Sequence, residues 1–93
     1  MTAMLFMCRV ADYEAWRPRY EVAMEHTPDV KSWHVWHDQD DPNFVVIVET
    51  YDSREAAEQL LESQEVQDLM AKDGVELASI QVRYLNEDGG GSR

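Results

Sequence analysis

A short apolar run, FVVIV at residues 44–48, constrains the fold of this chain more than any other segment. Side chains of a strand point alternately to the two faces of a sheet, so a strand with one solvated face alternates apolar and polar residues. Five apolar residues in succession instead predict a strand that is buried on both faces. Because the helices of a two-layer domain cover one face only, the run predicts a second sheet against the other face.

The length and net charge of the chain exclude several classes of protein. The 93 residues suffice for one domain, and 19 acidic against 8 basic side chains give a formal net charge of −11. This charge argues against nucleic acid and anionic membranes as partners, because both are bound through Lys and Arg. The single cysteine, Cys8, cannot form an internal disulfide, and no apolar run approaches the roughly 20 residues of a membrane span. With no basic leader at the N-terminus, we expect a cytoplasmic protein.

Two helical regions separate the predicted strands. The first begins at Asp12 as N-cap and contains Pro18, where we expect a kink or a short first turn. The second opens at residues 52–55, which have the spacing of a capping box, and ends at Gly74 as C′ glycine. Its apolar period slips at Ser63, which predicts a second N-cap there. Steps of three and four residues place one group on a single face of the first helix: Tyr13, Trp16, Tyr20, Ala23 and Met24.

Four strands complete the pattern, at residues 4–10, 30–38, 44–48 and 80–84. The order β-α-β-β-α-β, with a DDPN turn joining the two middle strands, predicts a ferredoxin-like α+β fold. We expect an antiparallel sheet with both helices on one face, and a sheet-to-sheet homodimer that covers the other. Residues 1–86 are assigned to this domain and residues 87–93 to a disordered, glycine-rich tail, either natural or added.

Several segments resemble small bacterial proteins of the dimeric α+β barrel superfamily, near its antibiotic biosynthesis monooxygenase-like branch. They are VADYEAWRP (residues 10–18), DDPN (40–43), SREAA (53–57), SQE (63–65) and MAKDGV (70–75). The resemblance implies a homodimer formed sheet to sheet, with a pocket between each sheet and its own helices. Members of the superfamily include cofactor-independent oxygenases of aromatic polyketides, haem-degrading enzymes and aromatic-ring cyclases.

The catalytic residues of the oxygenases do not carry over to this chain. Those enzymes place an Asn, a Trp and a basic residue around the pocket. Here the asparagines are Asn43, which belongs to the predicted turn, and Asn86, near the tail, and no tryptophan falls on the second helix. The resemblance therefore predicts the fold and leaves the activity open.

His34 and His37 are the most reactive side chains of the predicted second strand. Residues three apart on a strand point to opposite faces, so the two cannot ligate one metal ion, and we predict no metal site. The histidine that faces the helices would suit general acid–base chemistry, and the alternative is a histidine at the dimer interface or in solvent. If one acts, we expect His37, which shares a face with Trp33 and would lie near Glu49.

Aromatic side chains are dense for so short a chain, which predicts a pocket for a flat ligand or, alternatively, a packed core. The favoured hypothesis is a dimer that binds a small aromatic or hydrophobic metabolite between sheet and helices, without turnover. The alternative is a cofactor-independent monooxygenase or cyclase of an aromatic, polyketide-like substrate, with His37 as base and Tyr13 or Tyr51 positioning an oxygen. Neither hypothesis needs a cofactor. The expected ligand-binding residues are Tyr13, Trp16, Trp33, His34, Trp36 and Tyr51.

Overall fold

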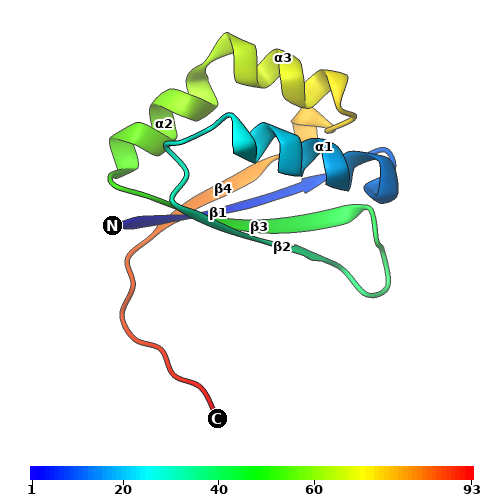
Figure 1. Ribbon diagram of the computed structural model, residues 1–93. Helices are drawn as coiled ribbons and strands as arrows, with labels where there is room; N and C mark the ends of the chain where they lie inside the picture. Colours follow the sequence, from blue (N-terminus) through cyan, green and yellow to red (C-terminus); the bar gives the residue numbers. More distant parts are fainter.

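The computed structural model describes residues 1–93 as a four-stranded antiparallel sheet with three α-helices on one of its faces (Figure 1). This architecture confirms the predicted ferredoxin-like α+β class. The strand order is β2-β3-β1-β4, so that β1 and β3 are central. The elements are β1 (Thr2–Arg9), α1 (Tyr13–Glu25), β2 (Ser32–His37), β3 (Phe44–Tyr51), α2 (Arg54–Glu62), α3 (Gln64–Lys72), a short 3-10 helix η1 (Leu77–Ser79) and β4 (Gln81–Leu85).

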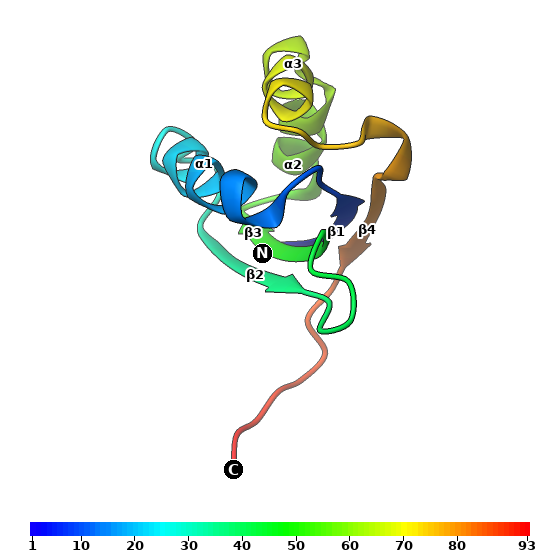
Figure 2. The same cartoon turned by 90° about the vertical axis from the view of Figure 1, so that its right-hand side faces the viewer.

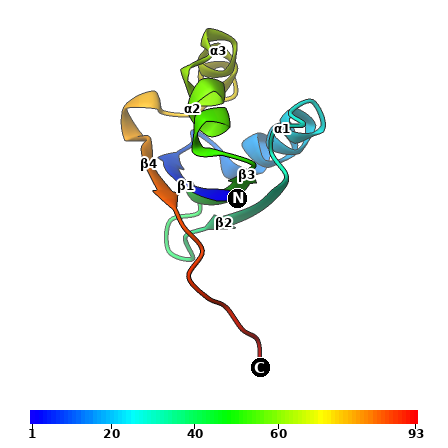
Figure 3. The same ribbon diagram turned by 90° about the vertical axis from the view of Figure 1, so that its left-hand side faces the viewer.

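The helices form two groups above the sheet. Views along the sheet show α1 above the side of β2 and β3, with α2 and α3 stacked beside it above the middle of the sheet (Figures 2 and 3). The opposite face of the sheet carries no layer from this chain. Residues 86–93 contain no helix or strand and extend away from the sheet (Figure 1). No helix is both long and apolar enough to cross a membrane.

The helix ends follow the predicted caps with one shift. Asp12 caps α1, accepting a hydrogen bond from the Glu14 amide. The helix is not cut short at Pro18 but runs through it to Glu25, although Pro18 has no amide donor. Helix α2 is capped by Ser53 rather than Asp52, because the Ser53 hydroxyl accepts from Ala56 N at 3.2 Å. The carboxylate of Asp52 instead lies 3.7 Å from the Lys31 ammonium.

The break between α2 and α3 is at Ser63, as predicted, although its side chain makes no cap hydrogen bond. The backbone there is extended (φ −63°, ψ 128°), which turns the chain between the two short helices. Gly74 follows α3 with φ +91°, a left-handed conformation that favours glycine and that confirms the predicted C′ position.

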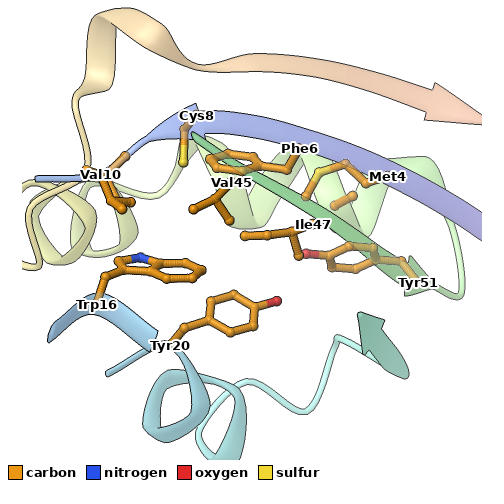
Figure 4. Close-up of a cluster of buried hydrophobic side chains, with 11 residues drawn as sticks. Met4, Phe6, Cys8, Val10, Trp16, Tyr20, Val45, Ile47 and Tyr51 are labelled. Carbon is orange, nitrogen blue, oxygen red and sulfur yellow. The ribbon is translucent and has the colours of Figure 1, made fainter. Parts of the chain in front are cut away.

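Strand register separates the side chains of the sheet into two sets. In β3, Val45 and Ile47 point toward the helices and are 0% and 2% exposed, while Val46 and Val48 between them point to the open face and are half-buried. The β1–β3 pairing places Phe6 opposite Ile47 and so sets the same alternation in β1. Figure 4 shows that the buried core of the chain lies wholly between the sheet and the helices.

Candidate functional site

A cavity of about 100 Å³ lies between the sheet and all three α-helices. Fifteen of its 18 lining residues are hydrophobic. Strands β1 and β3 form its floor, and α1, α2 and α3 form its walls. The lining includes Met4, Phe6, Cys8, Trp16, Tyr20, Ile47, Tyr51, Leu61, Val66, Leu69 and Met70.

The Glu49 carboxylate on β3 forms the buried polar centre of this apolar lining, whose other polar members are Thr27 and Asp73. Glu49 is 6% exposed and is the one charged residue that the fold buries. The Tyr20 hydroxyl donates to its Oε2 and the Tyr51 hydroxyl to its Oε1, each at 2.5 Å. Figure 4 shows these two hydroxyls directed toward one another from α1 and β3. The two tyrosines thus hold the carboxylate from opposite sides.

Electrostatics keep the two tyrosines in their donor form. Burial, followed by the charge of Glu49, raises the pKa of both Tyr20 and Tyr51 far above that of a free phenol. Both hydroxyls therefore retain their protons throughout the neutral range. None of the five ion pairs in the structure includes Glu49, so the direct partners of its carboxylate are the two tyrosine hydroxyls.

Cys8 also lines the cavity but is not suited to nucleophilic chemistry. Its side chain is fully buried, and burial raises the pKa of the thiol to about 11. A nucleophilic cysteine needs a lowered pKa and an accessible thiolate, and Cys8 has neither. We therefore assign Cys8 to the packing of the cavity floor.

An open groove of about 750 Å³ connects the cavity with solvent between α1 and α3. Its lining contains more polar and charged residues than that of the cavity, among them Arg19, His26, Asp29 and Glu65. Six residues line both spaces and therefore mark where one opens into the other: Ala23, Thr27, Leu60, Val66, Leu69 and Asp73. A ligand can extend from the cavity into this groove.

A row of aromatic rings runs along the inner face of α1. His37 stacks on Tyr13 with ring centroids 4.1 Å apart, and Trp16 stacks on Tyr20 at 5.1 Å. Trp33 meets Tyr20 edge-on at 5.3 Å. The Arg17 guanidinium lies 5.2 Å from the centre of the Trp33 ring and bonds Glu21, while its Nη1 is buried without a hydrogen-bond partner.

The site residues predicted from the sequence fall into three groups according to where they lie in the structure. Trp16 and Tyr51 line the cavity. Tyr13, Trp33 and His37 lie on the same side of the sheet but outside the cavity lining. His34 and Trp36 lie on the open face, with Trp36 62% exposed.

The expected proximity of His37 to Glu49 is wrong. His37 does share a strand face with Trp33, but the β2–β3 register pairs His37 with Val45 and places Trp33 opposite Glu49. The alternation of residues predicts which β2 side chains share a face of the sheet, but it does not determine which β3 residue each of them pairs with.

Glu49 and Tyr20 are the cavity residues whose role the sequence did not predict. The alternation Val45, Ile47, Glu49, Tyr51 carries a signal for Glu49, because it places this residue on the buried face of β3. A charged residue normally argues for the solvent side of a strand. The two tyrosine donors, from separate elements, are what make its burial tolerable.

Solved structures show which known fold this is. A candidate antibiotic biosynthesis monooxygenase from Chloroflexus aurantiacus is 22% identical, with a TM-score of 0.69, covering 98% of this chain and 96% of its own. A second antibiotic biosynthesis monooxygenase has a TM-score of 0.72 at 14% identity, covering 96% of this chain and 100% of its own. SnoaB, a cofactor-independent oxygenase from Streptomyces nogalater, has a TM-score of 0.70 at 9% identity, covering 96% and 94%.

No family model and no curated protein matches the sequence. The likeness to solved structures therefore identifies the fold. This chain has the ferredoxin-like fold of the antibiotic biosynthesis monooxygenase-like proteins, which confirms the resemblance drawn from its sequence segments.

Proposed function

We propose that this protein is a homodimeric binding protein that holds a small, mainly apolar metabolite in the cavity between its sheet and helices. The observation that carries this proposal is the cavity of about 100 Å³, with its apolar lining and one buried polar centre. Binding sites for small molecules typically combine apolar walls with a few fixed polar groups. An apolar cavity of about 150 Å³ is enough to hold benzene, so a ligand of a few heavy atoms suits this one.

Binding without turnover is favoured over the alternative, a cofactor-independent monooxygenase or cyclase. The alternative is supported by the likeness of fold to SnoaB, which is a cofactor-independent oxygenase. His37, its proposed base, stacks on Tyr13 outside the cavity lining, where it does not meet a ligand held at Glu49. We therefore propose binding as the function, in the cytoplasm, where the free thiol of Cys8 would stay reduced.

Ligand binding can be tested with isobutanol as a probe, followed by NMR. Ala23 lies where the cavity opens into the groove, so Ala23→Leu fills that opening. We expect isobutanol to shift cavity resonances in the wild-type protein and to bind Ala23→Leu about tenfold more weakly or less. Ala15→Leu, an exposed change on the same helix, is the matched control. Equal binding by all three proteins would place the ligand elsewhere.

Support for the homodimer comes from the open face of the sheet. Apolar side chains from all four strands point to it, and large exposed apolar patches mark protein interfaces. Trp36 and Leu85 on this face are 62% and 41% exposed. Other members of the patch are Leu5, Met7, Phe44, Val46 and Val48.

A charge placed at the centre of this patch tests the dimer. We expect native mass spectrometry to give twice the 10.8 kDa of one chain for the wild-type protein. Val46→Lys should give the monomer, because it puts a charge into the apolar interface, while Gln59→Lys on exposed α2 should stay dimeric. A monomeric wild-type protein would refute the dimer and leave the cavity proposal standing.

A further inference from the structure

The carboxylate of Glu49 presents an unbalanced negative charge to the cavity. A buried charge is costly unless it is paired, and in folded proteins a cation usually supplies the pair. Glu49 is 6% exposed and takes part in no ion pair. Arg17, one helical turn before Tyr20, pairs with Glu21 through Nη2 and lies over the Trp33 ring; its Nη1 has no hydrogen-bond partner and makes no ion pair with Glu49.

The carboxylate also has unused hydrogen-bonding capacity. An ionised carboxylate offers about four lone-pair sites on its two oxygens. Tyr20 and Tyr51 occupy one site on each oxygen, which leaves about two sites free. Because Glu49 is part of the cavity wall, a ligand in the cavity can reach it. The complementary group is a donor that carries a positive charge.

Aromatic rings around the same space favour a cation as well. Trp16, Tyr20 and Tyr51 line the cavity together with Phe6. The face of an aromatic ring attracts ammonium groups, and the attraction grows where water is excluded. The chain as a whole carries a net charge of −11, which raises the concentration of cations near its surface.

We infer that the cavity selects a small protonated amine, with its ammonium group at the Glu49 carboxylate and its apolar body among the hydrophobic lining residues. This inference rests on the proposed binding function and adds the charge of the ligand to it. The ammonium group supplies up to three donors, of which two can fill the free sites on Glu49. A carboxylate ligand of the same size is excluded by repulsion from the same residue.

Three probes of matched shape test the inference: isobutylamine, isobutanol and isobutyrate, titrated by NMR at neutral pH and about 150 mM salt, which screens surface charges. We expect isobutylamine to bind at least about tenfold more tightly than isobutanol, and isobutyrate not to bind. Glu49→Gln should remove the preference by weakening the amine and sparing the alcohol. Glu62→Gln, which removes one charge from the exposed surface, should keep it.

Other results would separate the charge preference from binding itself. If isobutanol binds the wild-type protein as tightly as isobutylamine, the inference fails and the proposed binding function stands. If no probe binds, both fail. If Glu49→Gln still prefers isobutylamine, another group of the protein binds the ammonium group and the inference fails.

A measurement on the wild-type protein covers the case in which Glu49→Gln does not fold. Intermolecular NOEs should connect the methylene next to the amine nitrogen with the ring protons of Tyr20 and Tyr51. NOEs to exposed acidic helix residues instead would show surface binding and overturn the inference.

Discussion

The two faces of the sheet are built from similar apolar side chains but differ in what they bury. The face under the helices combines apolar residues with Glu49, held by two tyrosine hydroxyls beside a cavity. The open face carries apolar residues such as Val46 and Val48 and an exposed Trp36, with no covering layer. A charge is tolerated on the first face because its partners are fixed in place, whereas the second face depends on another molecule for its burial.

The sharpest test of this contrast compares neighbouring residues of β3. Ile47→Ala leaves a cavity in the helix-covered core and should lower the free energy of unfolding by about 2–5 kcal/mol. Urea unfolding should give this loss at every protein concentration. Val46→Ala on the open face should cost little in dilute solution and more as the dimer forms. Concentration-independent losses for both variants would mean that the faces do not differ in this way.

A smaller effect is expected from the polar centre of the covered face. Tyr51→Phe removes a donor from the buried Glu49 and should lower the free energy of unfolding by about 1–3 kcal/mol. Tyr84→Phe is the matched control, because the Tyr84 hydroxyl makes no hydrogen bond within the chain and the change keeps the ring, whose centre lies 4.4 Å from the Arg54 guanidinium. Equal losses in the two variants, measured by thermal unfolding, would show that the hydrogen bond to Glu49 adds nothing.

The smallest effect belongs to charges at the rim of the open face, which remain in solvent. There Arg9 pairs with Asp41, and the guanidinium hydrogen bond lowers the pKa of the Asp41 carboxyl. Because the pKa of Asp41 is lower in the folded than in the unfolded protein, the ion pair stabilises the fold at pH values above the unfolded pKa of about 4. This stabilisation is lost as the pH falls below about 4 and through the pKa of the folded state.

Asp41→Asn should therefore differ slightly from the wild-type protein at neutral pH and not at all in strong acid. Thermal unfolding at the two pH values checks this, and added salt should shrink the neutral-pH difference because the pair is exposed. A difference that persists in acid would have another origin than the charge of Asp41.

Much of the fold could be predicted because its signals are local. The cap at Asp12, the break at Ser63 and the left-handed Gly74 each depend on a few neighbouring residues. The shift of the α2 cap from Asp52 to Ser53 shows the limit of such signals. Both residues are good caps, and a distant partner, Lys31, engages the first of them.

The site was harder to predict because its parts meet through tertiary geometry. Tyr20 and Glu49 are 29 residues apart, and only the position of α1 above β3 brings the hydroxyl to the carboxylate. The sequence identified the inner face of α1 through Trp16 and Tyr20, but alternation alone could not set the β2–β3 register that separates His37 from Glu49. Residue patterns specify faces, while hydrogen-bond partners require the packed structure.

The shallow burial of helix α3 has a consequence for the local stability of the cavity wall. It contributes Val66, Leu69 and Met70 to the cavity wall, yet none of its side chains is fully buried. A helix held by so few buried contacts opens locally at low cost in free energy, well before the sheet unfolds. Bound ligand contacts this helix in the closed form and should therefore slow amide hydrogen exchange in α3 far more than in β1 or β3.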